Sequence, residues 1–193
     1  MTKVLVLFAT DYGNTKKMAE TVAAGARSVN HCTVTLKLAE EATEQDLIDT
    51  DALILGSPVH MGSPDWRVKK FIDKVCSKLW MQDKLIGKIG GVFVTGGGFG
   101  SAGGGCELSM LAMITNLAEL GMVLAPLPKN TPGYAHGGLQ WGPYARSAGI
   151  NGDPVGVSED SLEAAFHHGA NIARLAESLK GAHPFVSAAS AKV

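Results

Sequence analysis

The chain has 193 residues, of which 46% are hydrophobic and 18% are charged. This length fits one domain with a full core, and the composition excludes a disordered chain, a coiled coil and a collagen-like fibre. With 17 basic and 18 acidic side chains the formal net charge is −1, which argues against a nucleic-acid-binding surface and against a strongly acidic docking surface.

The first half of the chain alternates between predicted strands and helices. Residues 4–8 are a continuous apolar run, typical of a strand buried on both faces, and residues 15–29 carry apolar positions at helical spacing. Residues 32–38 alternate as a second strand. A short helix capped by Thr43 follows, and residues 52–55 form a third buried strand.

The second half continues this alternation. Residues 63–65 (Ser-Pro-Asp) predict a helix start, since they combine an N-cap hydroxyl, Pro at the first helical position and an early carboxylate. Residues 89–95 and 122–127 are the fourth and fifth predicted strands. The helix between them, 106–120, is apolar nearly all round, so we expect it to be buried on more than one side, in the core or at a subunit interface. Ser158 opens the last predicted helix.

Five strands that alternate with helices predict the α/β class, with a doubly wound parallel sheet covered by helices on both faces. The chain shows no linker and no internal repeat, so we expect one domain over residues 1–180 and a flexible tail over 181–193. Residues 128–157 are rich in Gly and Pro without clear periodicity. Trp141 and Tyr144 within this segment favour a functional loop.

The loop after the first strand predicts a phosphate site. In open α/β sheets, ligands bind beyond the carboxyl ends of the strands. Residues 10–15 (Thr-Asp-Tyr-Gly-Asn-Thr) run into a helix whose N-terminus offers free N–H groups and a positive dipole. A phosphate fits there without an arginine, and the carboxylate of Asp11 should then point away from it. The alternative is a capped helix that merely follows a strand.

Two further loops predict contacts to a flat ring. Residues 56–62 form a stiff turn between two glycines, against which a planar ring could lie at residues 59–61; an ordinary strand-to-helix turn is the alternative. Residues 95–105 are rich in Gly and include Gly-x-Gly-x-x-Gly at 98–103. That pattern is a weak sign of a nicotinamide dinucleotide, because it does not lie in a first βαβ unit. Together the three loops predict a mononucleotide with a large planar base.

Short motifs along nearly the whole chain resemble a known family. Thr-x-Tyr-Gly-Asn-Thr-x-x-Met-Ala-Glu at 10–20 resembles the FMN-phosphate signature of flavodoxin-like proteins. The remaining motifs resemble the tryptophan-repressor-binding-protein (WrbA) family of FMN-dependent NAD(P)H:quinone oxidoreductases. These motifs are Gly56-Ser57-Pro58, Leu79-Trp80, Gly103-Gly104-Gly105-Cys106-Glu107, Leu117-Ala118-x-x-Gly121-Met122 and Pro143-Tyr144-Ala145. The resemblance implies a flavodoxin-like fold with five parallel strands in the order 2-1-3-4-5.

The resemblance also implies the cofactor, FMN, and its site. The implied cofactor-binding residues are Thr10, Asp11, Tyr12, Gly13, Asn14, Thr15, Pro58, Val59, His60, Met61, Gly62, Thr95, Gly96, Gly97, Gly98 and Gly100. Tyr12 would lie near the nicotinamide of NAD(P)H and Trp80 near the quinone-type acceptor. A homodimer or homotetramer with active sites near subunit interfaces is implied as well.

Other residues are candidates from their position in the chain or from a departure from the family. Trp141 and Tyr144 could close over the ring face as substrate-binding residues, or simply pack their loop. His136 in the same segment is a candidate catalytic residue, and a solvated loop histidine is the alternative. Glu119 stands where the family often has a histidine and is the other catalytic candidate. Its carboxylate does not favour an anionic reduced flavin or quinol. Cys106 replaces a glutamine of the family.

The sequence therefore predicts an FMN-dependent oxidoreductase that transfers two electrons from NAD(P)H to a quinone, with ping-pong kinetics. The alternative is a non-enzymatic flavodoxin-type electron carrier between protein partners. Such carriers are usually strongly acidic, which the net charge of −1 does not match. A flavin-free or regulatory binding module is a third possibility.

The remaining expectations concern metals, thiols and location. We expect no metal site, because His167 and His168 are adjacent in a helix and point to different faces. Cys32, Cys76 and Cys106 predict reduced, mostly buried thiols in a cytoplasmic protein. We expect no signal peptide and no membrane span, since no apolar run approaches about 18 residues.

Overall fold

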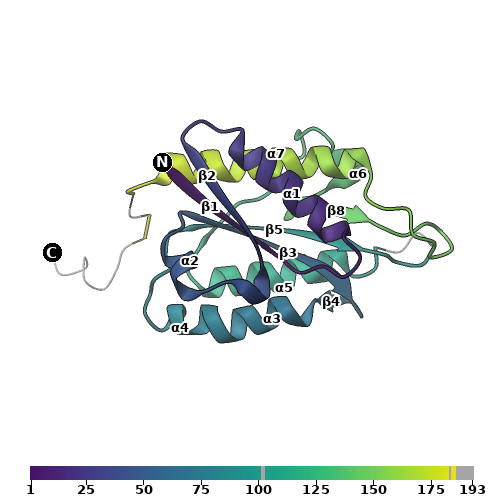
Figure 1. The fold of residues 1–193 in the computed structure, drawn as a ribbon. Helices are drawn as coiled ribbons and strands as arrows, with labels where there is room; N and C mark the ends of the chain where they lie inside the picture. Colours follow the sequence, from purple (N-terminus) through teal and green to yellow (C-terminus); the bar gives the residue numbers. More distant parts are fainter. Residues whose placement is uncertain (101–102, 183, 186–193) are drawn as a thin grey trace.

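The computed structural model describes residues 1–100, 103–182 and 184–185, and shows a sheet between two layers of helices (Figure 1). In chain order the elements are β1 (Thr2–Phe8), α1 (Asn14–Arg27), β2 (Cys32–Leu38), a 3-10 turn (Ala39–Glu41), α2 (Glu44–Ile48), β3 (Ala52–His60), β4 (Ser63–Pro64), α3 (Trp66–Phe71), a π-helical turn (Ile72–Cys76), α4 (Ser77–Trp80), β5 (Ile89–Gly96), α5 (Cys106–Glu119), β6 (Val123–Leu124), α6 (Tyr134–Gly137), β7 (Gly138–Leu139), β8 (Gly142–Arg146) and α7 (Glu159–Leu179). Helices α1 and α7 cover one face of the sheet, and α3, α4 and α5 cover the other.

The sheet has the order β2-β1-β3-β5-β8-β7, with β4 paired to β3 and β6 paired to β5. Strand β1 pairs in parallel with β2 and β3, and β3 pairs in parallel with β5. These pairings confirm the α/β class and the predicted order of the first four strands. The carboxyl ends of β1, β3 and β5 consequently lie side by side at one end of the sheet (Figure 1).

Two segments share the fifth place in the sheet. Strand β6 pairs with the first two residues of β5 and β8 with the last three, both in parallel. The prediction of one uninterrupted strand over 122–127, and of one long loop over 128–157, is therefore wrong. Gly142 and Pro143 begin β8 and interrupt the apolar alternation that would mark a strand.

The helix on the second face begins later than the sequence predicts. Strand β3 continues to His60 and turns back as β4, so Ser63 is paired in a strand and is not the N-cap. The N-cap is Asp65, whose carboxylate accepts a hydrogen bond from the backbone N–H of Arg67 at 2.8 Å. Asp65 therefore satisfies a donor of the first helical turn.

The long apolar helix α5 is buried on one side only within a single chain. Met110, Met113 and Leu117 pack in the core, whereas Leu108 is 66% exposed on the outer face. The expected burial on more than one side is thus not found in this chain alone. Cys106 begins the helix and is buried, which raises the pKa of its thiol to about 11.

In the part of the chain that the structure describes, no helix is both long and apolar enough to cross a bilayer. Most of the expected flexible tail over 181–193 lies outside the described residues.

Candidate functional site

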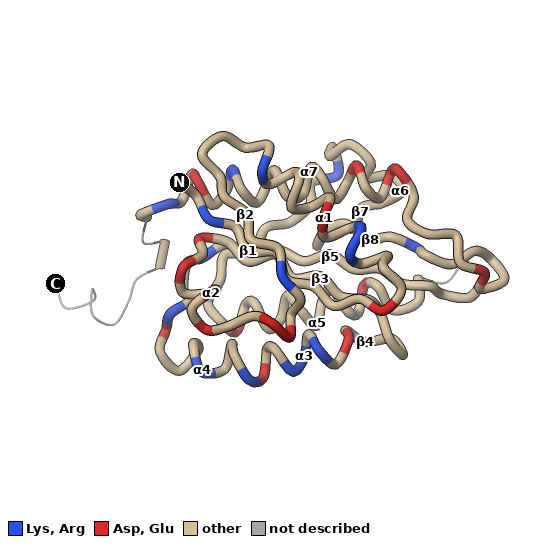
Figure 2. Tube along the Cα trace, viewed as in Figure 1, with Lys and Arg blue, Asp and Glu red and all other residues tan. Residues whose placement is uncertain are grey.

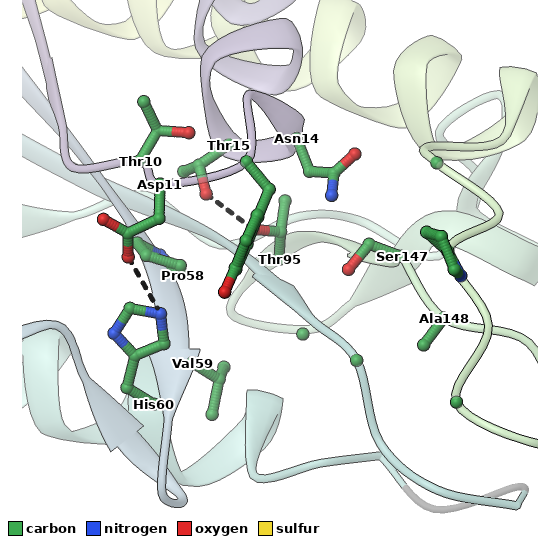
Figure 3. Close-up of a pocket in the computed structure, with 16 residues that line it drawn as sticks. Thr10, Asp11, Asn14, Thr15, Pro58, Val59, His60, Thr95, Ser147 and Ala148 are labelled. Atoms are coloured by element: carbon green, nitrogen blue, oxygen red, sulfur yellow. Dashed lines mark hydrogen bonds and ion pairs between the residues drawn. The ribbon is translucent and has the colours of Figure 1, made fainter.

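A pocket of about 530 Å³ lies at the carboxyl ends of β1, β3 and β5 (Figure 3). Its size falls within the range of small-molecule sites. The residues that line it are Thr10, Asp11, Tyr12, Asn14, Thr15, Pro58, Val59, His60, Thr95, Gly96, Gly97, Ser147, Ala148, Gly152, Pro154 and Gly156. All three loops that the sequence predicts to converge there contribute to this lining.

The first wall of the pocket is the loop between β1 and α1. Gly13 adopts a left-handed conformation (φ 83°) and its N–H donates to the hydroxyl of Thr10 at 3.1 Å. The first intrahelical hydrogen bond runs from the N–H of Lys17 to Gly13. Among the hydrogen bonds of the described residues, none takes up the N–H groups of Asn14 and Thr15 at the helix start. The loop therefore presents free donors and a helix dipole to a bound anion.

The floor of the pocket joins this loop to the end of β5. The hydroxyls of Thr15 and Thr95 are 2.6 Å apart and buried (Figure 3). Each hydroxyl is thereby satisfied away from water. Next to them, Gly96 approaches Val59 and Cys106 so closely that a Cβ there would lie 2.7 Å from the Cys106 sulfur. Only glycine fits this position without displacing its neighbours.

A network of charges lies beside the first wall. The carboxylate of Asp11 accepts from Arg67 Nη2 at 2.8 Å and lies 3.2 Å from His60 Nε2. The fully buried Asp65 lies 3.0 Å from His60 Nδ1 and accepts from Arg67 through both of its oxygens at 2.8 Å. Figure 3 shows Asp11 turned toward His60, on the side of the pocket away from Asn14.

The same four residues bear on the question of a metal. Ligand atoms of Asp11, His60 and Asp65 lie within 4.8 Å of one another, close enough to hold an ion. Both carboxylates, however, already accept hydrogen bonds from Arg67. A divalent ion would have to sit beside this guanidinium, so we assign no metal to the cluster.

The opposite wall is formed by residues 147–156, the last part of the segment 128–157 that the sequence predicts to be a functional loop. Residues 147–156 fold back on themselves, with Val155 N–H donating to Ser147 at 3.1 Å, and Ser147 N–H donates to Gly96 of β5 at 3.0 Å. Arg146, the last residue of β8, stabilises this segment by donating a hydrogen bond from its Nε to the carbonyl of Ala148 at 2.9 Å. The sequence did not predict the place of this segment beside β5, because it did not identify β8 as a strand.

Five of the residues expected at the cofactor lie outside the lining: Gly13, Met61, Gly62, Gly98 and Gly100. Met61 adopts a positive φ of 50° and its side chain is fully exposed at the tip of the turn between β3 and β4. Gly100 donates its N–H to Ile150 at 2.8 Å and so ties the Gly-rich loop to the opposite wall. These five residues therefore belong to the loops that form the pocket but do not face its interior.

The expected substrate and catalytic residues are not gathered there, apart from Tyr12. Trp80 ends α4 and Glu119 ends α5, and both helices end near the amino end of the sheet, opposite the pocket. Trp141 and Tyr144 line other hollows, beside α5. His136 is exposed on α6, which packs against the start of α7.

Arg67 is a charged residue near the site that the sequence did not predict. The available signal is its place two residues after an acidic N-cap, directly beyond the predicted ring-binding loop. Because arginine at the start of a helix opposes the dipole, its presence there indicates a specific acidic partner.

Comparisons with known proteins agree with this architecture. Residues 5–96 match the family model described as "Flavodoxin domain". A curated protein named flavodoxin, from Aquifex aeolicus (strain VF5), is 44% identical over 124 residues, which span 64% of this chain and 64% of that protein.

Solved structures resemble the chain over most of its length. The flavodoxin, WrbA-like protein from Agrobacterium tumefaciens has a TM-score of 0.69 and 27% identity, covering 92% of this chain and 99% of that one. A flavodoxin from the domain Archaea has a TM-score of 0.65 at 20% identity, covering 91% of this chain and 99% of that one, and shows the fold alone. The chain therefore has the α/β flavodoxin-like fold and contains a flavodoxin-like domain.

Proposed function

We propose that this protein binds FMN in the pocket at the carboxyl ends of β1, β3 and β5, and that it acts as an electron carrier between protein partners. The observation that carries the FMN assignment is the first wall of the pocket. There the hydroxyl of Thr10 and the free N–H groups of Asn14 and Thr15 at the start of α1 border one space. Such a donor set suits a phosphate monoester.

The rest of the pocket suits a flat ring. Val59, Gly96 and Gly97 offer a wall of small and apolar groups, and the segment 147–156 faces them from the other side. Thr15 belongs to both parts, through its buried hydroxyl contact with Thr95. We infer that the phosphate lies toward α1 and the ring between the last two loops.

A bound flavin supplies reversible one- and two-electron chemistry, so the protein needs no acid–base triad of its own. The chain's residues then have three tasks. The loop at 10–15 binds the phosphate, and the glycines of β5 allow close approach of the ring. The loop after β3 and the segment 147–156 limit the access of water.

The carrier role is supported by the curated relative named flavodoxin and by the surface around the pocket. Large apolar side chains stand exposed on the loops that line or adjoin the pocket. They are Tyr12 (90%), Met61 (102%), Phe99 (76%), Ile150 (65%) and Val155 (59%). An apolar rim of this kind is typical of a surface that another protein covers.

A second candidate is two-electron transfer from NAD(P)H to a quinone. It is supported by the likeness to the WrbA-like protein over 92% of this chain. Under this candidate Trp80 and Glu119 act from a neighbouring copy, because they lie opposite the pocket of their own chain.

Anaerobic titration of the protein reconstituted with FMN distinguishes the two functions. For the carrier, stepwise dithionite should accumulate a one-electron-reduced flavin, whereas NADH and NADPH should reduce it slowly or not at all. Rapid bleaching by either nicotinamide, with recovery of the spectrum on adding benzoquinone, would establish the second candidate instead. A protein that leaves added FMN unbound would contradict both.

A further inference from the structure

The pocket contains one charge that should repel its proposed ligand. Asp11 lies in the loop that offers hydrogen-bond donors to the phosphate, and it lines the pocket. A carboxylate beside a phosphate dianion is unfavourable unless a cation compensates it. The loop itself, residues 10–15, contains no basic residue.

The compensating cation comes from another element. Arg67 lies in the first turn of α3, and its Nη2 donates to Asp11 at 2.8 Å while its Nη1 donates to the Thr10 carbonyl at 3.3 Å. The guanidinium therefore contacts both the carboxylate and the backbone of the phosphate loop. Its side chain is only 17% exposed, so solvent screens these contacts weakly.

Arg67 is itself held in a fixed orientation. Its Nε and Nη2 donate to the two oxygens of Asp65 at 2.8 Å each, a paired geometry that only arginine provides. Asp65 is fully buried, and its backbone N–H donates to Ser57 at 2.8 Å. Burial raises the pKa of the Asp65 carboxyl, but the hydrogen bonds and charge of Arg67 outweigh it, so the pKa lies below its ordinary value.

We propose that Arg67, anchored on Asp65, is a positioning residue that neutralises Asp11 and turns it out of the phosphate site. It thereby sets the preference of the pocket for the phosphorylated flavin over riboflavin. This inference rests on the proposed binding of FMN. Riboflavin carries the same ring without the phosphate, so its binding should be insensitive to the charge of Asp11.

The test is a double-mutant cycle between positions 67 and 11. The cycle keeps Asp65, because this residue anchors Arg67 in the proposal. Any distortion from leaving its buried carboxylate unpaired should affect both flavins, so the riboflavin titration measures that distortion. Arg67→Met, Asp11→Asn and the combination are compared by titration calorimetry with FMN and, separately, with riboflavin. Arg27→Met, at the far end of α1, is the matched control, and circular dichroism verifies folding.

We expect Arg67→Met to weaken FMN binding roughly 10- to 100-fold and to leave riboflavin binding within about twofold. Asp11→Asn should restore most of the lost FMN affinity, because it removes the charge that Arg67 compensates. Arg67→Lys should keep the charge but lose the paired geometry, and give a smaller loss for FMN alone. If the Met variants do not fold, the FMN and riboflavin affinities of Arg67→Lys test the proposal instead.

Two results would overturn the inference while leaving FMN binding intact. One is an equal loss of FMN and riboflavin, which indicates a merely structural role for Arg67. The other is a failure of Asp11→Asn to restore affinity. If the folded natural protein binds riboflavin and FMN equally or binds neither, the proposed phosphate site fails, and this inference fails with it.

Discussion

His168 is a histidine in a site that suits an apolar residue. It lies on the face of α7 toward the sheet, is fully buried, and among the described residues its ring nitrogens make no well-formed hydrogen bond, only a weak interaction with the backbone of Val92. Two glycines leave room for the ring: a Cβ at Gly91 or Gly142 would lie 3.2 or 3.6 Å from its Nε2. Burial lowers the pKa of His168 to about 4, so the imidazole is neutral in the folded protein.

This environment predicts a loss of stability in mild acid. The folded-state pKa lies below the unfolded value of about 6.5, so the unfolded chain binds more protons between pH 6.5 and 4. The free energy of unfolding should therefore fall by about 3 kcal/mol as the pH falls through this window. Urea denaturation at several pH values measures it.

His168→Leu should remove this part of the pH dependence, since leucine fills a buried site without a titrating group. His136→Gln, at an exposed histidine, serves as the control for replacing a histidine. An unaltered slope in His168→Leu would show that other groups cause the acid sensitivity.

Single residues also show where sequence reasoning reaches its limit. The free N–H groups at the start of α1 were predictable, because a strand, a glycine turn and a helix follow one another within a few residues. The role of Arg67 was not, because its partners Asp11 and Asp65 come together only when β1 and β3 are paired.

Among the elements, helices α1 and α7 cross at unusually short range. A Cβ added at Gly25 of α1 would lie 1.8 Å from the Phe166 carbonyl oxygen, and one at Gly169 of α7 would lie 2.0 Å from that of Val22. The absence of a side chain at these two positions, one on each helix, therefore allows the backbones of α1 and α7 to come into direct contact. The side chains around this crossing belong to the core between these helices and the sheet.

We expect Gly169→Ala to destabilise the protein by about 1–3 kcal/mol, because the added methyl must push the helices apart. Helix propensity alone predicts the opposite, a gain of about 1 kcal/mol. Urea denaturation decides between the two effects. Ser178→Ala, on the exposed part of α7, reports propensity without the clash; a stabilised Gly169→Ala would refute the close contact.

The elements differ in how far sequence could predict them. Strands β1, β3 and β5 were predictable because each is a short apolar run buried between two layers of helices, and the edge strand β2 was predictable because its apolar residues alternate with polar ones. The fifth position was not predictable, because β6 and β8 share it and residues 125–141 separate them in the chain. In addition, β8 begins with Gly142 and Pro143. The opposite wall of the pocket, residues 147–156, follows β8. Because the sequence did not predict β8, it did not predict the position of this wall either.

At the scale of the whole molecule, charge gives little guidance to function. Figure 2 shows acidic and basic residues interspersed along the trace, as the net charge of −1 suggests. The pocket, by contrast, joins distant parts of the chain, since its lining runs from Thr10 to Gly156. A ligand bound there should therefore stabilise the fold as a unit.

Adding FMN at 100 times its Kd should raise the free energy of unfolding by about 2.7 kcal/mol, because the ligand binds only the folded state. Riboflavin at the same concentration should give a smaller increase. Urea denaturation with and without each flavin measures both. If FMN binds but the unfolding midpoint does not move, the pocket is not part of the cooperative unit.

The crossing of α1 and α7 also bears on how the chain is made. The ribosome releases α1 more than a hundred residues before α7. At ordinary elongation rates that interval is on the order of ten seconds. Throughout it, the apolar side of α1 around Met18 and Val22 has no helix to cover it. We therefore expect the nascent polypeptide to expose this apolar side until translation is nearly complete, and a chain that ends before α7 to aggregate more readily than the full chain.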